Sequence, residues 1–129
     1  MAALICTLFM NFSFKRDVHL KDKASYGYVF HRSSYTTNKT GYVSTIIYQK
    51  SSCDSFKTWE DARKKFGIYL VGKYDLKSNY DLSNVIHYTG SDYGMSTKEL
   101  VIEAIDKMIA AEEKAGNKIV RTDFNYLCE

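Results

Sequence analysis

The segment that most constrains the fold runs from Ser96 to Gly116 and has the pattern of an amphipathic helix. Ser96 and Glu99 fit the S-x-x-E capping box, in which each side chain accepts a hydrogen bond from a backbone N–H at the helix start. Gly116 offers the residue without a Cβ that commonly ends a helix. Apolar residues recur at spacings of three and four, which places on one stripe Val101, Ala104, Ile105, Met108, Ile109 and Ala111. The segment therefore predicts a helix lying across a small β-sheet.

Alternation of polar and apolar residues predicts the strands of that sheet. Three segments alternate in this way: Met1 to Phe14, Tyr26 to Tyr35 and Tyr42 to Lys50. The loop between the second and the third is rich in Thr, Asn and Gly, as in a hairpin connection. We therefore expect an antiparallel meander of three strands.

The remaining segments complete the predicted fold. A second helix is expected from Thr58, its N-cap, to Gly72, then a short strand over Asn84 to Thr89 and a last strand over Lys118 to Cys128. The order β-β-β-α-(β)-α-β predicts an α+β fold. We expect one domain over residues 1–129, with a mostly antiparallel sheet and both helices packed on one face.

Composition bounds the class of protein. The chain has 129 residues, of which 45% are hydrophobic and 26% charged, as in a soluble globular domain. The net charge of +3 permits an acidic partner without requiring one. Glycine-rich nucleotide loops and H-E-x-x-H are missing from the sequence, so neither a cofactor nor a metal is expected.

The cysteines and the first segment bear on the compartment. Cys6, Cys53 and Cys128 form no C-x-x-C pair, which predicts free thiols in a reducing cytoplasm. The apolar segment over residues 1–14 has no charged n-region and is shorter than the roughly 20 residues that span a bilayer. We therefore expect a cytoplasmic protein without a membrane partner. The same segment, as an exposed edge strand, predicts a homodimer.

Two similar triplets, His31-Arg32-Ser33 and His87-Tyr88-Thr89, are the most specific catalytic candidates. Each follows two apolar residues, and alternate residues of a strand share a face, so each histidine would lie beside a hydroxyl. The pair resembles the two-histidine phosphoesterase superfamily in these six residues. The resemblance implies that His31 and His87 act as general acid and base on a phosphodiester, with Ser33 and Thr89 orienting the phosphate.

The 11 tyrosines suggest a binding face. One side of the second and third strands would carry aromatic residues interleaved with basic ones: Tyr26, Tyr28, Phe30, Arg32, Lys39, Tyr42, Tyr48 and Lys50. Such a face could stack nucleic-acid bases or serve as a protein interface. Alternatively, it packs against the helices. The pattern leaves both interpretations open because both sides of the strands carry apolar residues.

A basic cluster around the Trp59 helix is the third candidate, formed by Lys57, Arg63, Lys64 and Lys65. These side chains could contact phosphates or simply face water. In its general character, small and rich in Tyr, Lys and Asn, the chain looks like accessory proteins of bacteriophages and mobile elements. Many of those bind and block a host defence protein or capture its signal molecule. Our first hypothesis is therefore a non-catalytic binding or inhibitor protein with a protein partner. The alternatives are the phosphodiesterase and a module that binds nucleic acid or nucleotide.

Overall fold

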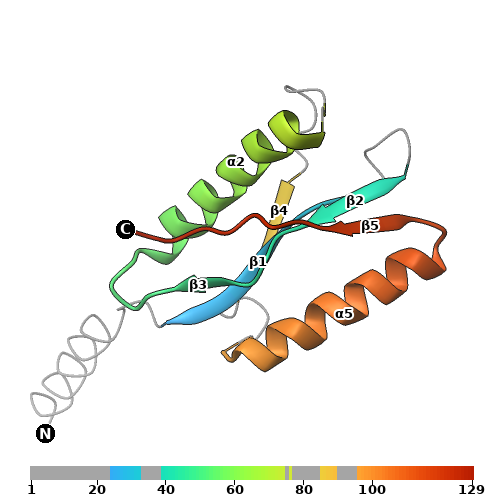
Figure 1. The fold of residues 1–129 in the computed structure, drawn as a ribbon. Helices are drawn as coiled ribbons and strands as arrows, with labels where there is room; N and C mark the ends of the chain where they lie inside the picture. Colours follow the sequence, from blue (N-terminus) through green and yellow to red (C-terminus); the bar gives the residue numbers. More distant parts are fainter. Residues whose placement is uncertain (1–23, 33–38, 75, 77–84, 90–95) are drawn as a thin grey trace, which may run out of the picture.

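The computed structural model describes residues 24–32, 39–74, 76, 85–89 and 96–129, and for residues 85–89 it describes the backbone. The elements, in chain order, are β1 (Ser25–His31), β2 (Thr40–Val43), β3 (Ile47–Gln49), α2 (Ser55–Tyr74), β4 (Val85–Thr89), α5 (Lys98–Lys114) and β5 (Lys118–Arg121). They form a small α+β unit, as the sequence predicted (Figure 1). The expected first strand, Met1 to Phe14, lies outside the described residues.

Strand β1 is the centre of a mixed sheet. Along one edge it pairs antiparallel with β4, from Gly27 opposite Thr89 to His31 opposite Val85. Along the other edge it pairs antiparallel first with β3 and then with β2, which are the two halves of the predicted third strand. The prediction of a mostly antiparallel sheet is confirmed, and β5 is the parallel exception, because it runs parallel to β2. The reason is topological: β4 and β5 are joined through α5, a helical crossover that returns the chain in the same direction.

The two helices cover opposite faces of the sheet, so the prediction of both helices on one face is wrong. Val29 and Ile47 pack with Trp59 and other apolar residues of α2. Tyr28 and Phe30, which alternate with Val29 along β1, pack on the other side beneath α5. Figure 1 shows the strands running between the two helices. Both faces of β1 are apolar because both are buried, and this explains why its sequence pattern did not reveal one core face.

The helix ends follow the expected chemistry, with shifts at both N-caps. α2 begins earlier than predicted: Oδ1 of Asp54, not the Thr58 hydroxyl, accepts a 2.8 Å hydrogen bond from the backbone N–H of Lys57. In α5 the N-cap is Thr97 rather than Ser96, and its hydroxyl accepts from the N–H of Leu100. Gly116 ends α5 as predicted, with a φ of 88°.

The segment after β5, residues 122–129, is called the tail below. The tail continues beside the segment that runs from β2 to β3, but its register against that segment shifts. Val43 pairs with Arg121, whereas Tyr48 is bridged to Leu127. The tail therefore contains one extra residue between these points, which is a bulge. A disulfide between Cys128 and Cys53 fixes the tail beside the start of α2. The prediction of free thiols is thus wrong for these two cysteines, because the fold brings together residues 75 positions apart. Cys6 lies outside the described residues.

Candidate functional site

The two histidine positions lie close together in the sheet. His87 is opposite Val29, and His31 is two residues further along β1, so the two histidines are diagonal neighbours on one face. The His31 side chain has 0% exposure, and its ring lies edge-on to Tyr42. Ser33 and the side chains of His87 and Thr89 lie outside the described part of the chain. The register brings only the His31 and His87 positions together, and the phosphodiesterase stays a prediction.

The predicted tyrosine face is not formed as one exposed surface. Tyr28 is buried beneath α5, whereas Tyr42 is buried on the opposite side, against the core that α2 covers. Tyr42 changes face because it pairs with His31 rather than with an even-numbered residue of β1. Tyr26 is half-buried, with its ring centre 5.0 Å from that of Tyr48, which is 41% exposed. Arg32 and Lys50 are exposed.

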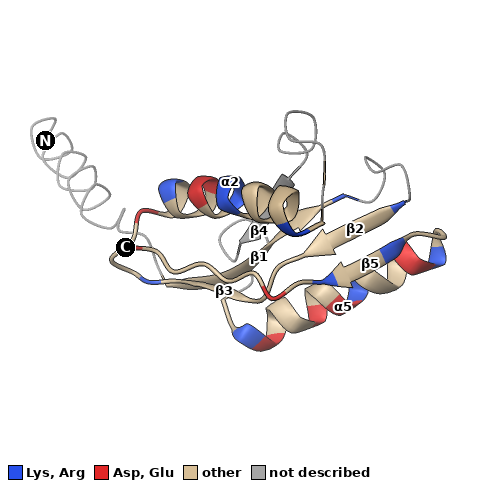
Figure 2. Cartoon of the chain, turned by 45° about the horizontal axis from the view of Figure 1, so that its top comes forward, with Lys and Arg blue, Asp and Glu red and all other residues tan. Residues whose placement is uncertain are grey.

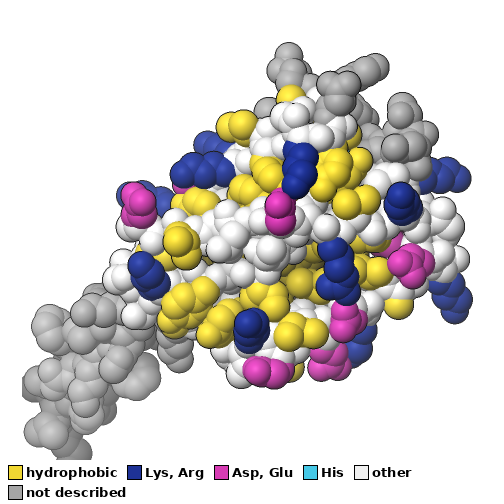
Figure 3. Space-filling view, viewed as in Figure 1, with side chains coloured by type: hydrophobic (Ala, Val, Ile, Leu, Met, Phe, Trp, Pro, Cys, Tyr) yellow, Lys and Arg dark blue, Asp and Glu magenta, His cyan; other side chains and the backbone are white. Residues whose placement is uncertain are grey.

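Only a small part of the predicted tyrosine face is exposed. Tyr48 and its bridged neighbour Leu127 are both exposed on the α5 side of the sheet. The space-filling view shows hydrophobic side chains at the surface over β3 and the start of β1 (Figure 3). Tyr48, Leu127 and the half-buried Tyr26 are therefore what stays at the surface here, in place of the broad face that was predicted.

The outward side of α2 is the more distinctive surface. We define the α2 outer face by Lys57, Lys64, Lys65 and Ile68, which are all exposed and which helical geometry places on one side. Within the described ranges Lys57 and Lys64 form no ion pair, while Lys65 contacts Asp61 at 3.2 Å. Ile68 is 65% exposed. Arg63, another predicted contact residue, is half-buried and paired with Glu60.

The charges of the two helices differ in sign. α2 carries five basic and two acidic side chains. α5 carries three basic and five acidic side chains. Figure 2 shows basic residues distributed along α2, and acidic residues more prominent on α5. Because the two helices lie on opposite faces of the sheet, one face carries a helix with an excess of basic residues and the other a helix with an excess of acidic residues.

A groove lies between the first turns of α2 and the tail. Its volume is about 450 Å³, and it is lined by Ser52, Cys53, Asp54, Lys57, Thr58, Asp61, Lys65, Tyr126, Leu127, Cys128 and Glu129. The Tyr126 hydroxyl donates to Oδ2 of Asp61, and this bond lowers the pKa of the Asp61 carboxyl. Burial, followed by that bond, raises the pKa of Tyr126 to about 12. The groove therefore combines the Asp61 carboxylate with a Tyr126 phenol that keeps its proton at neutral pH.

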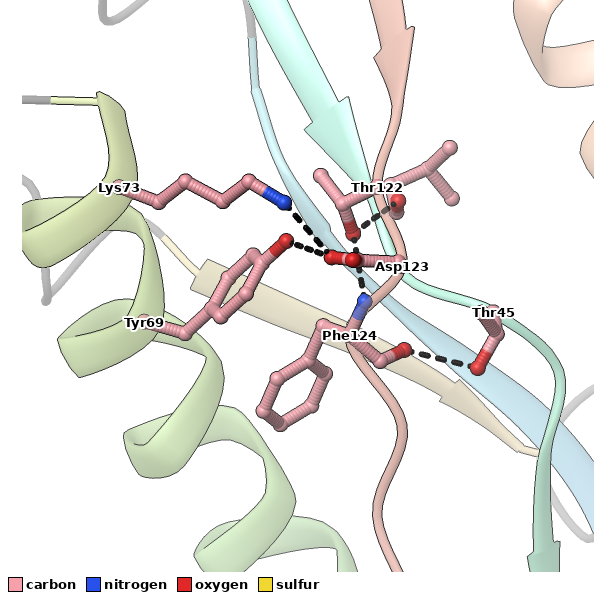
Figure 4. A network of polar contacts seen from close by, with 7 residues as sticks. Thr45, Tyr69, Lys73, Thr122, Asp123 and Phe124 are labelled. Carbon is pink, nitrogen blue, oxygen red and sulfur yellow. Dashed lines mark hydrogen bonds and ion pairs between the residues drawn. The ribbon is translucent and has the colours of Figure 1, made fainter.

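A second polar network joins α2 to the bulge of the tail (Figure 4). Oδ1 of Asp123 accepts hydrogen bonds from the Tyr69 hydroxyl and from Nζ of Lys73, the latter at 2.9 Å. These bonds, that of Tyr69 foremost, lower the pKa of Asp123. Burial and the bond to Asp123 raise the pKa of Tyr69. On the other side of the tail, the Thr45 hydroxyl donates to the carbonyl oxygen of Phe124. The network attaches the tail to α2.

Sequence reasoning missed both the groove and this network. The tail was expected to be a strand, but its contacts with α2 join residues 50 and 65 positions apart. The described residues contain no group of three or more His, Cys, Asp or Glu that could hold a metal ion. Among the same residues, no helix is long and apolar enough to cross a membrane. Comparison of the chain with protein-family models, curated proteins and solved structures found no match.

Proposed function

We propose that the chain is a non-catalytic binding protein whose α2 outer face engages an acidic protein partner. The observation that carries this proposal is the exposed Ile68 next to Lys64, on a helix with an excess of basic residues. An exposed apolar residue can fill a partner's pocket, while the surrounding cations attract acidic side chains and fix the orientation.

A protein partner is favoured over nucleic acid by the burial of the aromatic residues. Non-specific binders of single strands stack successive bases on exposed aromatic rings. Here Tyr28 and Tyr42, two of the proposed stacking residues, are buried in the core. Nucleic acid is therefore the second outcome of the test and not the proposal.

Capture with matched variants tests the proposal. The double variant Lys57→Glu/Lys64→Glu and the single variant Ile68→Ser should each fail to retain a partner protein that the wild type captures. The partner, once purified, should bind the purified wild type. Lys107→Glu on α5 is the matched control, since Lys107 is also an exposed lysine on a helix. Equal retention by all four proteins would contradict the assignment of the α2 outer face. Binding of single-stranded DNA that weakens steeply with salt would indicate the nucleic-acid module instead.

The phosphodiesterase is retained as the second candidate because of the register that makes His31 and His87 diagonal neighbours. Hydrolysis of bis(p-nitrophenyl) phosphate by the wild type, lost in His31→Ala and in His87→Ala, would support it. His19→Ala supplies the histidine control from elsewhere in the chain. The complete burial of His31 counts against an open catalytic cleft at this position.

The remaining expectations are proposals of the same kind. If the chain is an inhibitor, as phage accessory proteins often are, the acidic partner would be a host defence protein. A homodimer formed through residues 1–14 would give twice the monomer mass in light scattering at micromolar concentration. The cytoplasm stays a prediction, although its argument from free thiols no longer applies to Cys53 and Cys128.

A further inference from the structure

The Cys53–Cys128 disulfide lies in the wall of the groove between α2 and the tail. Both cysteines line the groove between α2 and the tail, although each residue is mostly buried. Cys53 directly precedes Asp54, the N-cap of α2, and Lys57 from the first turn lines the same groove. Glu129, with its negative charge, directly follows Cys128. A thiol reagent that enters the groove therefore comes up to the two residues that form the disulfide.

The two halves of the disulfide are held very differently. The backbone of Cys53 is fixed by a turn, in which its N–H donates to the carbonyl of Lys50, and its own carbonyl accepts a hydrogen bond from the buried Gln49. Next to Cys128, Leu127 is held by one isolated bridge to Tyr48 and its side chain is 69% exposed. Breaking the disulfide would leave Cys53 in place and remove the main restraint on Cys128.

We propose that Cys53 and Cys128 form a reversible thiol–disulfide site, whose reduction by a dithiol releases residues 127–129 from the groove. A thiolate of the dithiol attacks Sγ of Cys128, the S–S bond breaks, and Cys53 leaves as a thiolate. The second thiol of the reductant then attacks the mixed disulfide and expels the Cys128 thiolate. Two electrons pass to the protein, the reductant becomes a disulfide, and its two protons end on the two cysteines.

The direction of attack follows from the charges around the sulfurs. The N-terminal end of α2 and Lys57 favour a thiolate on Cys53, and the adjacent Asp54 carboxylate, whose Oδ1 accepts the Lys57 N–H, opposes them only in part, so Cys53 is the better leaving group. The neighbouring carboxylate makes the Cys128 thiolate less stable. An incoming thiol should therefore be trapped on Cys128.

The rest of the tail remains attached in the reduced protein. The Thr122 hydroxyl donates a 2.8 Å bond to the carbonyl of Val43, and the Phe124 ring lies 5.1 Å from that of Phe66 in the core. β5 continues to pair with β2 upstream of these contacts. Reduction therefore changes the end of the groove without unfolding the sheet.

Three measurements on the full chain under native conditions test the site. After treatment with dithiothreitol, Cys53 and Cys128 should become alkylated by iodoacetamide in parallel. Peptide masses assign the alkylation to each cysteine and distinguish it from alkylation of Cys6. Amide exchange should lose protection at residues 127–129, and β5 should keep its protection. Glutathione followed by an acid quench should trap the mixed disulfide on Cys128.

The double variant Cys53→Ser/Cys128→Ser should reproduce the exchange pattern of the reduced wild type, and Cys6→Ser should reproduce that of the oxidised protein. Resistance of the disulfide to dithiothreitol unless denaturant is added would overturn the proposal. So would loss of protection throughout β5, or trapping of glutathione on Cys53. These outcomes are independent of the partner proposed for the α2 outer face.

Discussion

The hydroxyl of Tyr126 donates a 2.6 Å hydrogen bond to Oδ2 of Asp61 in α2. Tyr126 lies two residues before Cys128, whose disulfide joins the tail to the start of α2. The bond lowers the pKa of Asp61 and contributes, after burial, to the raised pKa of Tyr126. Asp61 also forms an ion pair with Lys65, at 3.2 Å, so its carboxylate interacts with both the phenol and the ammonium group. A covalent and a polar contact thus hold the same short stretch of the tail.

We expect Tyr126→Phe to lower the free energy of unfolding by about 1 kcal/mol at pH 7, because it removes a hydrogen bond to a partly exposed carboxylate. The Tyr126 pKa is raised in the folded protein from 10.0 to about 12. Its stabilising effect is therefore complete below pH 10 and is lost as the pH rises from 10 towards 12. Urea unfolding of both proteins at pH 7 and above pH 10 measures the difference.

The same experiment has a sharp control. In the wild type the contribution of Tyr126 declines above pH 10, whereas Tyr126→Phe has no phenol at this position and should show a shallower decline. Parallel curves for the two proteins would mean that Tyr126 ionises alike in the folded and unfolded chains.

Asp54→Ala should destabilise the protein by about 1 kcal/mol, since it removes the side chain that accepts the Lys57 N–H at the start of α2. Thr97→Ala removes the corresponding cap of α5, where the hydroxyl accepts at 3.3 Å. We expect the smaller loss for Thr97 because the bond is longer. Thermal unfolding of the two variants beside the wild type gives the comparison, and an Asp54→Ala variant as stable as the wild type would show that another group caps α2.

Local patterns in the sequence predicted the elements better than their arrangement. The three-and-four spacing of Val101 and Ile105 and the glycine at Gly116 located α5 to within about two residues, the usual uncertainty of helix ends. The alternation around Val29 located β1. Neither pattern states which face of a strand is buried, and in β1 both faces are.

Long-range contacts explain what could not be predicted. Whether Cys53 meets Cys128 depends on the path of the tail along the neighbouring strand, and that path depends on a one-residue bulge without a distinctive sequence. The position of Tyr42 depends on its register with His31. A shift of one residue would have moved its ring to the opposite face.

Gln49→Ala should cost about 2 kcal/mol, because Oε1 of Gln49 accepts a 2.9 Å hydrogen bond from the indole N–H of Trp59 and both residues are buried. Trp59 is the single tryptophan, so its fluorescence reports directly on this site. We expect a changed emission maximum in the folded variant and a lower urea midpoint. An unchanged midpoint would mean that another group or a water molecule takes the place of the amide.

A pair of glycine substitutions tests the packing between β2 and β5. A Cβ on Gly41 would lie 2.8 Å from Cδ1 of Ile119 and 3.0 Å from the carbonyl oxygen of His31. Because that backbone oxygen is fixed in the sheet, Gly41→Ala should destabilise the protein by about 1–3 kcal/mol through overpacking. A Cβ on Gly72, near the end of α2, meets nothing within 4 Å. Gly72→Ala should therefore stabilise the protein by about 0.5 kcal/mol through helix propensity. Urea unfolding should move the two midpoints in opposite directions, and a Gly41→Ala variant at least as stable as the wild type would mean that the His31 carbonyl and the Ile119 side chain leave room for a Cβ.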